Sequence, residues 1–388
     1  MSERGRTARA RSGARYQPGA VGRRRPARQR GTVSVLSAVS LLALIGIGAF
    51  AVEVATLMVA RNELQNAADA TAMAGAACLA GRTECGNAGI RKPDWDTATL
   101  RAQAFVSSNK VQGLALVQGS VATGYWNMLA AAGDLQSNTI QPTDYDYPAI
   151  QVTVSREPGI NGGSLATPLA QLFGVNTAAL RASAVAVLSY PGTAPAGTLF
   201  PVAVSRCMYE TFWDTSARAP VLATQVSMPG LDLPQVVGEP IRFKVTSSYR
   251  AGPCESGQWT SFQTGIADAN ANDLNSLLSG GSGQSLSTGD GSWIVNGKKT
   301  KLYEGVNTCS EAGNKQCAYV MAPVVDSLVT GSFAPVRGFA CLRILSATKD
   351  GNSPYIVAQM SASEDRCPSL GSGVGPNYGI STPPRLVQ

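Results

Sequence analysis

The feature that most restricts how this chain can fold is a run of 21 residues without a charged side chain, from Thr32 to Val52. As a helix rising about 1.5 Å per residue, the run is about 31 Å long, which matches a hydrocarbon core of about 30 Å. Glu53 follows directly, where a spanning helix would leave the lipid. The run therefore predicts one transmembrane helix over residues 31–53.

The positive charge of the chain is concentrated before this run. Residues 1–30 contain ten arginines and one acid, a charge of +9, so the net charge of +7 leaves −2 for the rest. Basic residues beside an apolar helix keep that flank in the cytoplasm and attract anionic lipid headgroups. Only Tyr16 interleaves the arginines, which is not the aromatic pattern of nucleic-acid binding. We therefore expect a basic cytoplasmic tail over residues 1–30, contact with inner-membrane lipid, no nucleic-acid partner and a periplasmic bulk.

A cleaved secretory signal is the alternative interpretation of the same segment. Ala49, Phe50 and Ala51 form a small-x-small pattern of the kind that precedes a cleavage site. The apolar run is, however, longer than the roughly 7–15 residues of a signal, and no helix breaker follows it. An uncleaved, single-pass anchor is therefore favoured, and a mature chain beginning at Val52 would exclude it.

The absence of histidine removes several kinds of chemistry. Ser-His-Asp and Cys-His nucleophiles, histidine general bases and histidine-ligated zinc are excluded. Eight cysteines follow the apolar run, none in a Cys-x-x-Cys pair, which indicates disulfides in an oxidising compartment. Eight cysteines allow on the order of 100 connectivities, so the pairing stays open. The spacings favour two local and two long-range pairs: Cys78 with Cys85, Cys309 with Cys317, Cys207 with Cys254, and Cys341 with Cys367.

An alanine-rich helix is predicted to continue the apolar run over residues 54–81, since neither glycine nor proline occurs there before Gly75. Small residues recur along it at spacings of three, four and seven, and such a stripe lets another helix approach closely. That neighbour is either a helix of a partner protein or part of the chain's own domain, and both alternatives stay open. The candidate helix-packing residues are Ala60, Leu64, Ala67, Ala68, Thr71, Ala74 and Gly75.

This N-terminal segment resembles a known family. The sequence ARNELQNAADATAMAGA at residues 60–76, together with the apolar span and Glu53, resembles the N-terminal module of TadG-like Flp pilus assembly proteins. Gly124-Tyr125-Trp126 and Leu172-Phe173-Gly174-Val175 are similar to the adjoining Tad-type domain, expected over residues 82–191. The resemblance implies a component of the tight-adherence (Tad) machinery, which secretes and assembles Flp pili for cell adhesion, with Tad secretion or pilus assembly proteins and pilin as partners.

Two departures from the family limit what the resemblance implies. Longer relatives hold a metal with Asp-x-Ser-x-Ser, whereas the string from Asp214 to Arg218 lacks the last serine, so no metal site is carried over. Pilin-like relatives have an acid five residues after a processed glycine, but Leu36 stands at that distance from Gly31. A membrane-anchored, non-enzymatic assembly component is therefore favoured. The alternatives are a pilin-like structural or adhesive subunit of the fibre and an exported carboxylate-based hydrolase.

The exported region is predicted to be α+β, dominated by strands with short helices. A helix is expected over residues 94–106 with Asp94 as its cap, and another short helix with one apolar face of Leu165, Leu169, Leu172 and Phe173. Strands are expected over residues 150–155 and 182–188. Residues 192–197 predict a linker before a disulfide-braced, strand-rich domain over 198–388, in which Asn296-Gly297 predicts a hairpin over residues 293–303.

No catalytic residue, cofactor, metal or small-molecule substrate is expected. Asp144 and Asp146 are candidates for paired carboxylates or calcium ligands, but no further ligands are nearby and a solvated loop is favoured. The tryptophans are interpreted as core residues rather than partner anchors. These are Trp126, Trp213, Trp259 and Trp293.

Overall fold

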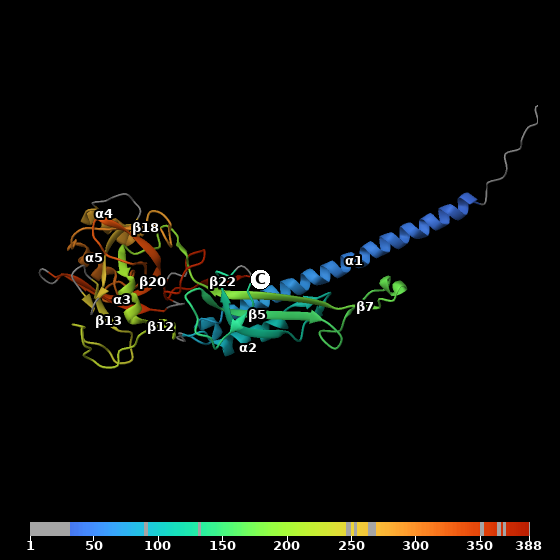
Figure 1. Cartoon of the computed structure of the whole chain (residues 1–388), viewed down its shortest axis with the longest axis horizontal. Coiled ribbons are helices and arrows are strands. Elements are labelled where there is room, and N and C mark those ends of the chain that lie inside the picture. The colour runs from blue at the N-terminus through green and yellow to red at the C-terminus, as the bar shows by residue number, and fades with distance from the viewer. Residues whose placement is uncertain are drawn as a thin grey trace, which may run out of the picture. The chain divides into compact units, whose positions relative to one another are not determined.

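The structure, a computed structural model, describes residues 32–88, 92–130, 133–245, 250–251, 254–262, 269–349, 353–362, 366–367 and 370–387. The basic tail predicted over residues 1–30 lies outside these residues. The chain divides into two compact units, Met1–Val54 and Ala55–Gln388. Strands dominate the second unit, with short helices between them, which confirms the α+β class (Figure 1).

One long helix, α1 (Thr32–Ala76), contributes to both units and is continuous over 45 residues. It contains no proline, and its glycines are confined to Gly46, Gly48 and Gly75. In the first unit its apolar side chains are exposed, from Val33 to Ile47 without exception. Within the described chain, α1 is the one helix long and apolar enough to cross a membrane. The predicted apolar and alanine-rich helices are thus one element.

A five-stranded antiparallel sheet follows α1, with strand order β22-β8-β5-β3-β4. The strands are β3 (Ser120–Asn127), β4 (Gln136–Ser137), β5 (Asp146–Arg156), β8 (Leu180–Ser189) and β22 (Thr382–Leu386). Helix α2 (Trp95–Val106) and the part of α1 after Ala55 pack on one face of this sheet. As predicted, Asp94 caps α2 by accepting a hydrogen bond from the Thr97 amide.

Short elements outside this sheet connect its strands and helices. They are the 3-10 helices η1 (Thr83–Cys85) and η2 (Ala170–Phe173), the pair β1 (Lys110–Val111) with β2 (Leu114–Ala115), and the pair β6 (Leu165–Ala166) with β7 (Thr177–Ala178). The short amphipathic helix predicted from Leu165 to Phe173 is wrong. Leu165 lies in β6, and only a single 3-10 turn forms before Gly174, whose φ of 86° ends it. Leu172 and Phe173 are exposed rather than buried.

The second sheet has seven strands in the order β13-β21-β20-β18-β16-β10-β19. Strand β19 also pairs with β20, so five of the strands close on themselves as a small barrel, and closure removes the open edges. The strands are β10 (Val202–Ser205), β13 (Arg242–Val245), β16 (Gly257–Phe262), β18 (Gly291–Ile294), β19 (Tyr319–Val325), β20 (Ser332–Thr348) and β21 (Tyr355–Ser361).

Three short helices accompany the second sheet: α3 (Arg206–Phe212), α4 (Ala271–Gly280) and α5 (Leu302–Cys309). The hairpin predicted over residues 293–303 is wrong, because β18 pairs with β16 and β20 and the chain continues into α5. Gly297 has the positive φ of 82° that its Asn-Gly signal indicates. That conformation makes a turn, and it does not require a second strand to follow.

Three two-stranded pairs complete the second unit: β9 (Thr193–Ala194) with β17 (Leu286–Ser287), β11 (Trp213–Asp214) with β12 (Ala219–Pro220), and β14 (Arg250–Ala251) with β15 (Cys254–Glu255). Strand β9 lies in the segment expected to be a linker. The chain then returns at its C-terminal end, where β22 pairs with β8 of the first sheet. The chain therefore passes between the two sheets twice, once after β8 and once before β22.

Candidate functional site

The candidate helix-packing residues of α1 lie against the chain's own domain. Six of the seven are buried and Ala74 is half-buried. Their neighbours include Ala98 and Ala102 of α2 and Ile150 of β5, in one apolar cluster with the alanines of β8. Because this stripe already has a neighbour within the chain, the opposite, exposed face of α1 is the one that a partner could reach.

Gly75 sets how closely α1 and α2 approach each other. A Cβ atom built at this position would lie 2.9 Å from Cβ of Ala102, 2.9 Å from Cδ1 of Ile150 and 3.1 Å from the carbonyl oxygen of Ala98. Real Cβ atoms essentially never approach other atoms within 3.0 Å. The missing side chain is therefore part of the packing between α1, α2 and β5.

Polar side chains fix the register of α1 on the sheet. Gln65 donates from Nε2 to the carbonyl oxygen of Ser183 in β8 at 3.2 Å and to Asp69 at 2.8 Å. Glu63 accepts a hydrogen bond of 2.7 Å from the backbone amide of Gln112, in the turn between β1 and β2. A buried helix whose contacts are only methyl groups can rotate or slide, whereas these directional bonds allow one arrangement.

The C-terminal end of α1 is closed by a disulfide and an asparagine. Cys78 and Cys85 are bonded across the turn that follows α1. Asn87 donates to the carbonyl oxygen of Cys78 and to the Asp94 carboxylate, each at 3.0 Å. Burial alone would raise the pKa of Asp94, but hydrogen bonds from Asn87 and Thr97 hold that pKa below its ordinary value. The turn that links α1 to α2 is thus locked at both ends.

The other disulfides brace the second sheet. The structure contains Cys207–Cys254, Cys309–Cys317 and Cys341–Cys367, the same pairs that the spacing favours. Their Cα atoms are 5.5, 4.9 and 6.1 Å apart, within the usual range for a disulfide. All eight cysteines of the sequence are therefore paired.

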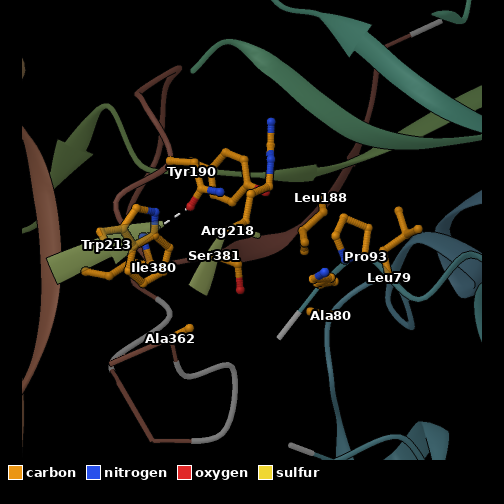
Figure 2. Close-up of a pocket in the computed structure, with 13 residues that line it drawn as sticks. Leu79, Ala80, Pro93, Leu188, Tyr190, Trp213, Arg218, Ala362, Ile380 and Ser381 are labelled. Atoms are coloured by element: carbon orange, nitrogen blue, oxygen red, sulfur yellow. Dashed lines mark hydrogen bonds between the residues drawn. The ribbon is translucent and has the colours of Figure 1, made fainter. Parts of the chain in front are cut away.

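Arg218 joins the first sheet to the loops around β11 and β12. Its guanidinium donates to the Tyr190 hydroxyl at 3.0 Å and to the carbonyl oxygens of Thr143 at 3.3 Å and Asp146 at 2.7 Å. The guanidinium carbon also lies 5.2 Å from the ring centre of Tyr125, a cation–π distance. Figure 2 shows Arg218 beside Tyr190, with Trp213 and Ile380 close by. Arg218 is 6% exposed, so a buried cation holds the two parts together.

Asp146, near this arginine, is a structural acceptor. Its carboxylate accepts hydrogen bonds from the Asn127 and Gln136 side chains and from both the amide and the hydroxyl of Thr143. Burial alone would raise its pKa, but these bonds, led by those of Thr143, lower it. The solvated loop predicted for the two aspartates is therefore wrong for Asp146, which is buried, while Asp144 is exposed.

Two cavities among the described residues of the second unit differ in size and openness. The one beside Arg218 has a volume of about 20 Å³, room for about one water molecule. A groove of about 390 Å³ on the sheet is open and lined by polar residues such as Thr153, Ser155 and Arg181. In the described residues no three histidine, cysteine, aspartate or glutamate side chains cluster as metal ligands. Trp126, Trp213 and Trp259 are buried and Trp293 is half-buried, as core residues are.

The comparisons with known proteins match this same helix and sheet. Residues 31–77 match the family model described as putative Flp pilus-assembly TadE/G-like, and residues 74–186 match the one described as putative Tad-like Flp pilus-assembly. Residues 31–186 are therefore similar to Flp pilus-assembly proteins, and we call this segment the Tad-like region. The comparisons with curated proteins and with solved structures give no match.

The Tad-like region coincides with structural elements. The first match covers α1, and the second runs from the last turn of α1 to β8, so the two matches overlap in the last turn of α1. The closed second sheet and β22 lie outside both matches. Sequence reasoning did not identify Gln65, Asn87 or Arg218 as contacts, because single polar residues without periodic neighbours carry no signal for their partners.

Proposed function

We propose that the chain is a membrane-anchored, non-enzymatic component of Flp pilus assembly that holds an exported unit at the periplasmic face of the inner membrane. The supporting observation is that α1 is one unbroken helix with two surfaces. Its first part is apolar, uncharged and exposed, as a lipid-facing helix is, and its later part is buried in the Tad-like region. Ten arginines precede it and favour a cytoplasmic N-terminus.

The mechanism that follows from this arrangement is mechanical. Helix α1 contains no proline, the residue that most often kinks a helix, and it is continuous from the first unit into the second. The disulfide Cys78–Cys85 and the bonds of Gln65 and Glu63 fix α1 to its sheet. Motion of the anchor would thus be passed to the exported unit, where pilin and Tad secretion proteins are the proposed partners.

The hydrolase alternative requires two carboxylates that face a common cleft. Asp144 and Asp146 do not supply this pair, because one is exposed and the other is buried with its oxygens hydrogen-bonded. The subunit alternative uses the same anchor helix and is separated by fractionation. Recovery of the chain in sheared pili would favour the subunit and contradict the assembly role.

The anchor is tested by placing a charge in the apolar run. Leu42→Arg should lower both the carbonate-resistant membrane fraction and pilus output, since a central arginine disfavours membrane insertion by about 2.5–3.5 kcal/mol. Leu100→Arg is the matched control, because Leu100 is an exposed leucine of α2, 66% accessible. A mature N-terminus at Val52, or equal behaviour of the two variants, would refute the anchor.

A further inference from the structure

The turn between β6 and β7 presents an apolar tip, which we define as Leu172, Phe173 and Val175. These side chains are 80%, 82% and 50% exposed. Two more exposed apolar side chains, Leu114 (52%) and Val117 (71%), belong to the segment at the base of this hairpin. Several large apolar side chains gathered on one protrusion are characteristic of an interaction surface.

The base of the tip is held rigidly to the sheet. Asn161 accepts from the amides of Val117 and Gln118 at 2.8 and 2.9 Å and donates to the carbonyl oxygens of Gln118 and Ser155, both at 2.8 Å. The buried Arg156 donates to the carbonyl oxygen of Gly163 at 2.9 Å. The exposed side chains are therefore presented by a fixed frame.

Several backbone groups of the tip are hydrogen-bonded within the hairpin. The Thr167 hydroxyl donates to the carbonyl oxygen of Val175 at 2.7 Å, and the Thr167 amide donates to that of Asn176 at 3.2 Å. Within the turn, the amides of Leu172, Gly174 and Val175 donate to carbonyl oxygens of residues 169–171. Each polar group that is paired internally lowers the cost of moving the segment toward an apolar medium.

The tip lies toward the end of α1 from which the apolar helix departs. Gly75 faces Ile150, whereas Gln65 bonds Ser183, the partner of Thr153 in the sheet. Moving back along α1 therefore corresponds to moving forward along β5, toward the β6–β7 hairpin (Figure 1). From Gln65 to Ala55 the helix rises about 15 Å. From Thr153 to Arg156 the strand advances about 10 Å, and the hairpin reaches further.

The charge pattern of the segment suits one kind of partner. Residues 158–180 contain no charged side chain, while Arg156, Glu157 and Arg181 flank them. A protein-binding loop usually has a polar rim, and an uncharged apolar tip with a flanking arginine is instead suited to the interface between lipid headgroups and acyl chains. Arg181 is exposed and could reach an anionic headgroup.

We propose that the apolar tip inserts into the interface of the same lipid bilayer that holds α1, as a second membrane contact. This inference rests on the proposed anchor, because the bilayer must lie at the Ala55 end of the unit. Two contacts, a spanning helix and an inserted tip, would fix the tilt of the exported unit on the membrane surface. One contact alone would leave it free to swing and rotate.

The test places a probe on the tip of the full-length chain. All native cysteines are paired, so Leu172→Cys provides a single free thiol for an environment-sensitive fluorophore. Leu129→Cys is the matched control, because Leu129 is also exposed (68%) but follows β3 at the opposite end of the sheet. Each labelled chain is reconstituted into phosphatidylethanolamine–phosphatidylglycerol vesicles, with or without lipid-borne nitroxide quencher, and circular dichroism checks its fold.

At position 172 the expected result is a blue-shifted emission that lipid nitroxides quench and aqueous iodide does not. At position 129 the emission should not be blue-shifted, and iodide rather than lipid nitroxide should quench it. Equal, iodide-accessible probes would overturn the proposal while carbonate resistance still upheld the anchor. A blue shift without nitroxide quenching would indicate that a second copy covers the tip, and would also overturn it. Release of the unlabelled chain by carbonate would refute the anchor itself, and the tip proposal with it.

Discussion

Replacing Gly75 with alanine should destabilise the second unit even though alanine is the better helix former. Alanine in place of glycine gains about 1 kcal/mol in helix propensity. The added Cβ would lie 2.9 Å from atoms of Ala102 and Ile150 and 3.1 Å from a backbone oxygen, and relieving such overpacking costs about 1–3 kcal/mol. The net loss for Gly75→Ala is therefore about 0–2 kcal/mol, and Gly75→Val, with two more methyl groups, should lose more than about 2 kcal/mol.

The matched control is Gly280→Ala. Gly280 is the last residue of α4, and no atom lies within 4 Å of a Cβ built there. This substitution has the propensity gain without the clash, so it should leave stability unchanged or raise it by up to about 1 kcal/mol. The assay is denaturant unfolding of the full chain in one detergent, followed by near-ultraviolet circular dichroism. The expected order of stability is Gly280→Ala, wild type, Gly75→Ala, Gly75→Val.

The result that refutes the reasoning is a Gly75→Ala chain at least as stable as the Gly280→Ala chain. It would mean that a methyl group fits between α1, α2 and β5 without displacement. The distance between the two helices would then be set by other contacts, and the glycine in the alanine-rich sequence would need another explanation.

Three further outcomes are expected. Removing the disulfide Cys207–Cys254 should lower the free energy of unfolding by about 4 kcal/mol, and removing Cys309–Cys317 should lower it by about 2.5 kcal/mol, because the closed loops span 47 and 8 residues. Equal losses in denaturant unfolding would contradict this dependence on loop length. Arg218→Met should cost roughly 2–4 kcal/mol, since it leaves buried carbonyl oxygens without donors, whereas the exposed Arg206→Met should change the melting temperature little. Burial raises the pKa of Tyr378 to about 12, and it also raises the pKa values of Tyr147 and Tyr209. Above about pH 10 the unfolded state then binds fewer protons than the folded one, so stability should fall by up to about 1.4 kcal/mol per pH unit for each tyrosine, and a flat alkaline profile would disprove it.

The parts of the fold that the sequence predicted are those encoded locally. The helix over 94–106 and its Asp94 cap follow from three neighbouring residues, and the strand at 150–155 follows from strict alternation. The first part of α1 follows from the length of the apolar run and its lack of charge. Each of these signals lies within about 20 consecutive residues, which is the range over which periodicity is informative.

The closed second sheet was not predictable because its pairing is non-local. Strand β10 pairs in parallel with β19, more than a hundred residues away, and β19 then pairs with β20 to complete the ring. No residue pattern within either strand indicates which other strand it pairs with. The hairpin predicted from Asn296-Gly297 failed for the same reason. A turn sequence indicates the local backbone conformation but not whether the next segment pairs with the preceding strand, and here helix α5 follows.

The C-terminal strand was missed for a different reason. Pro383 and Pro384 lack backbone N–H groups, which argues against a strand. Strand β22 nevertheless forms because it lies at the edge of its sheet, and the pairing register shifts between Thr382 and Arg385, where the prolines stand. For the candidate site, the stripe of small residues along α1 could be recognised in the sequence. Whether that stripe packs against a partner protein or against the chain's own sheet could not, because this depends on tertiary contacts.

The return of β22 to β8 has a consequence for how the protein matures. The residues of β22 are made some two hundred residues after β8, the strand with which they pair. Until they arrive, β8 presents its backbone N–H and C=O groups to any extended chain nearby. A molecule that lacks β22 would therefore remain open to aberrant strand pairing along β8.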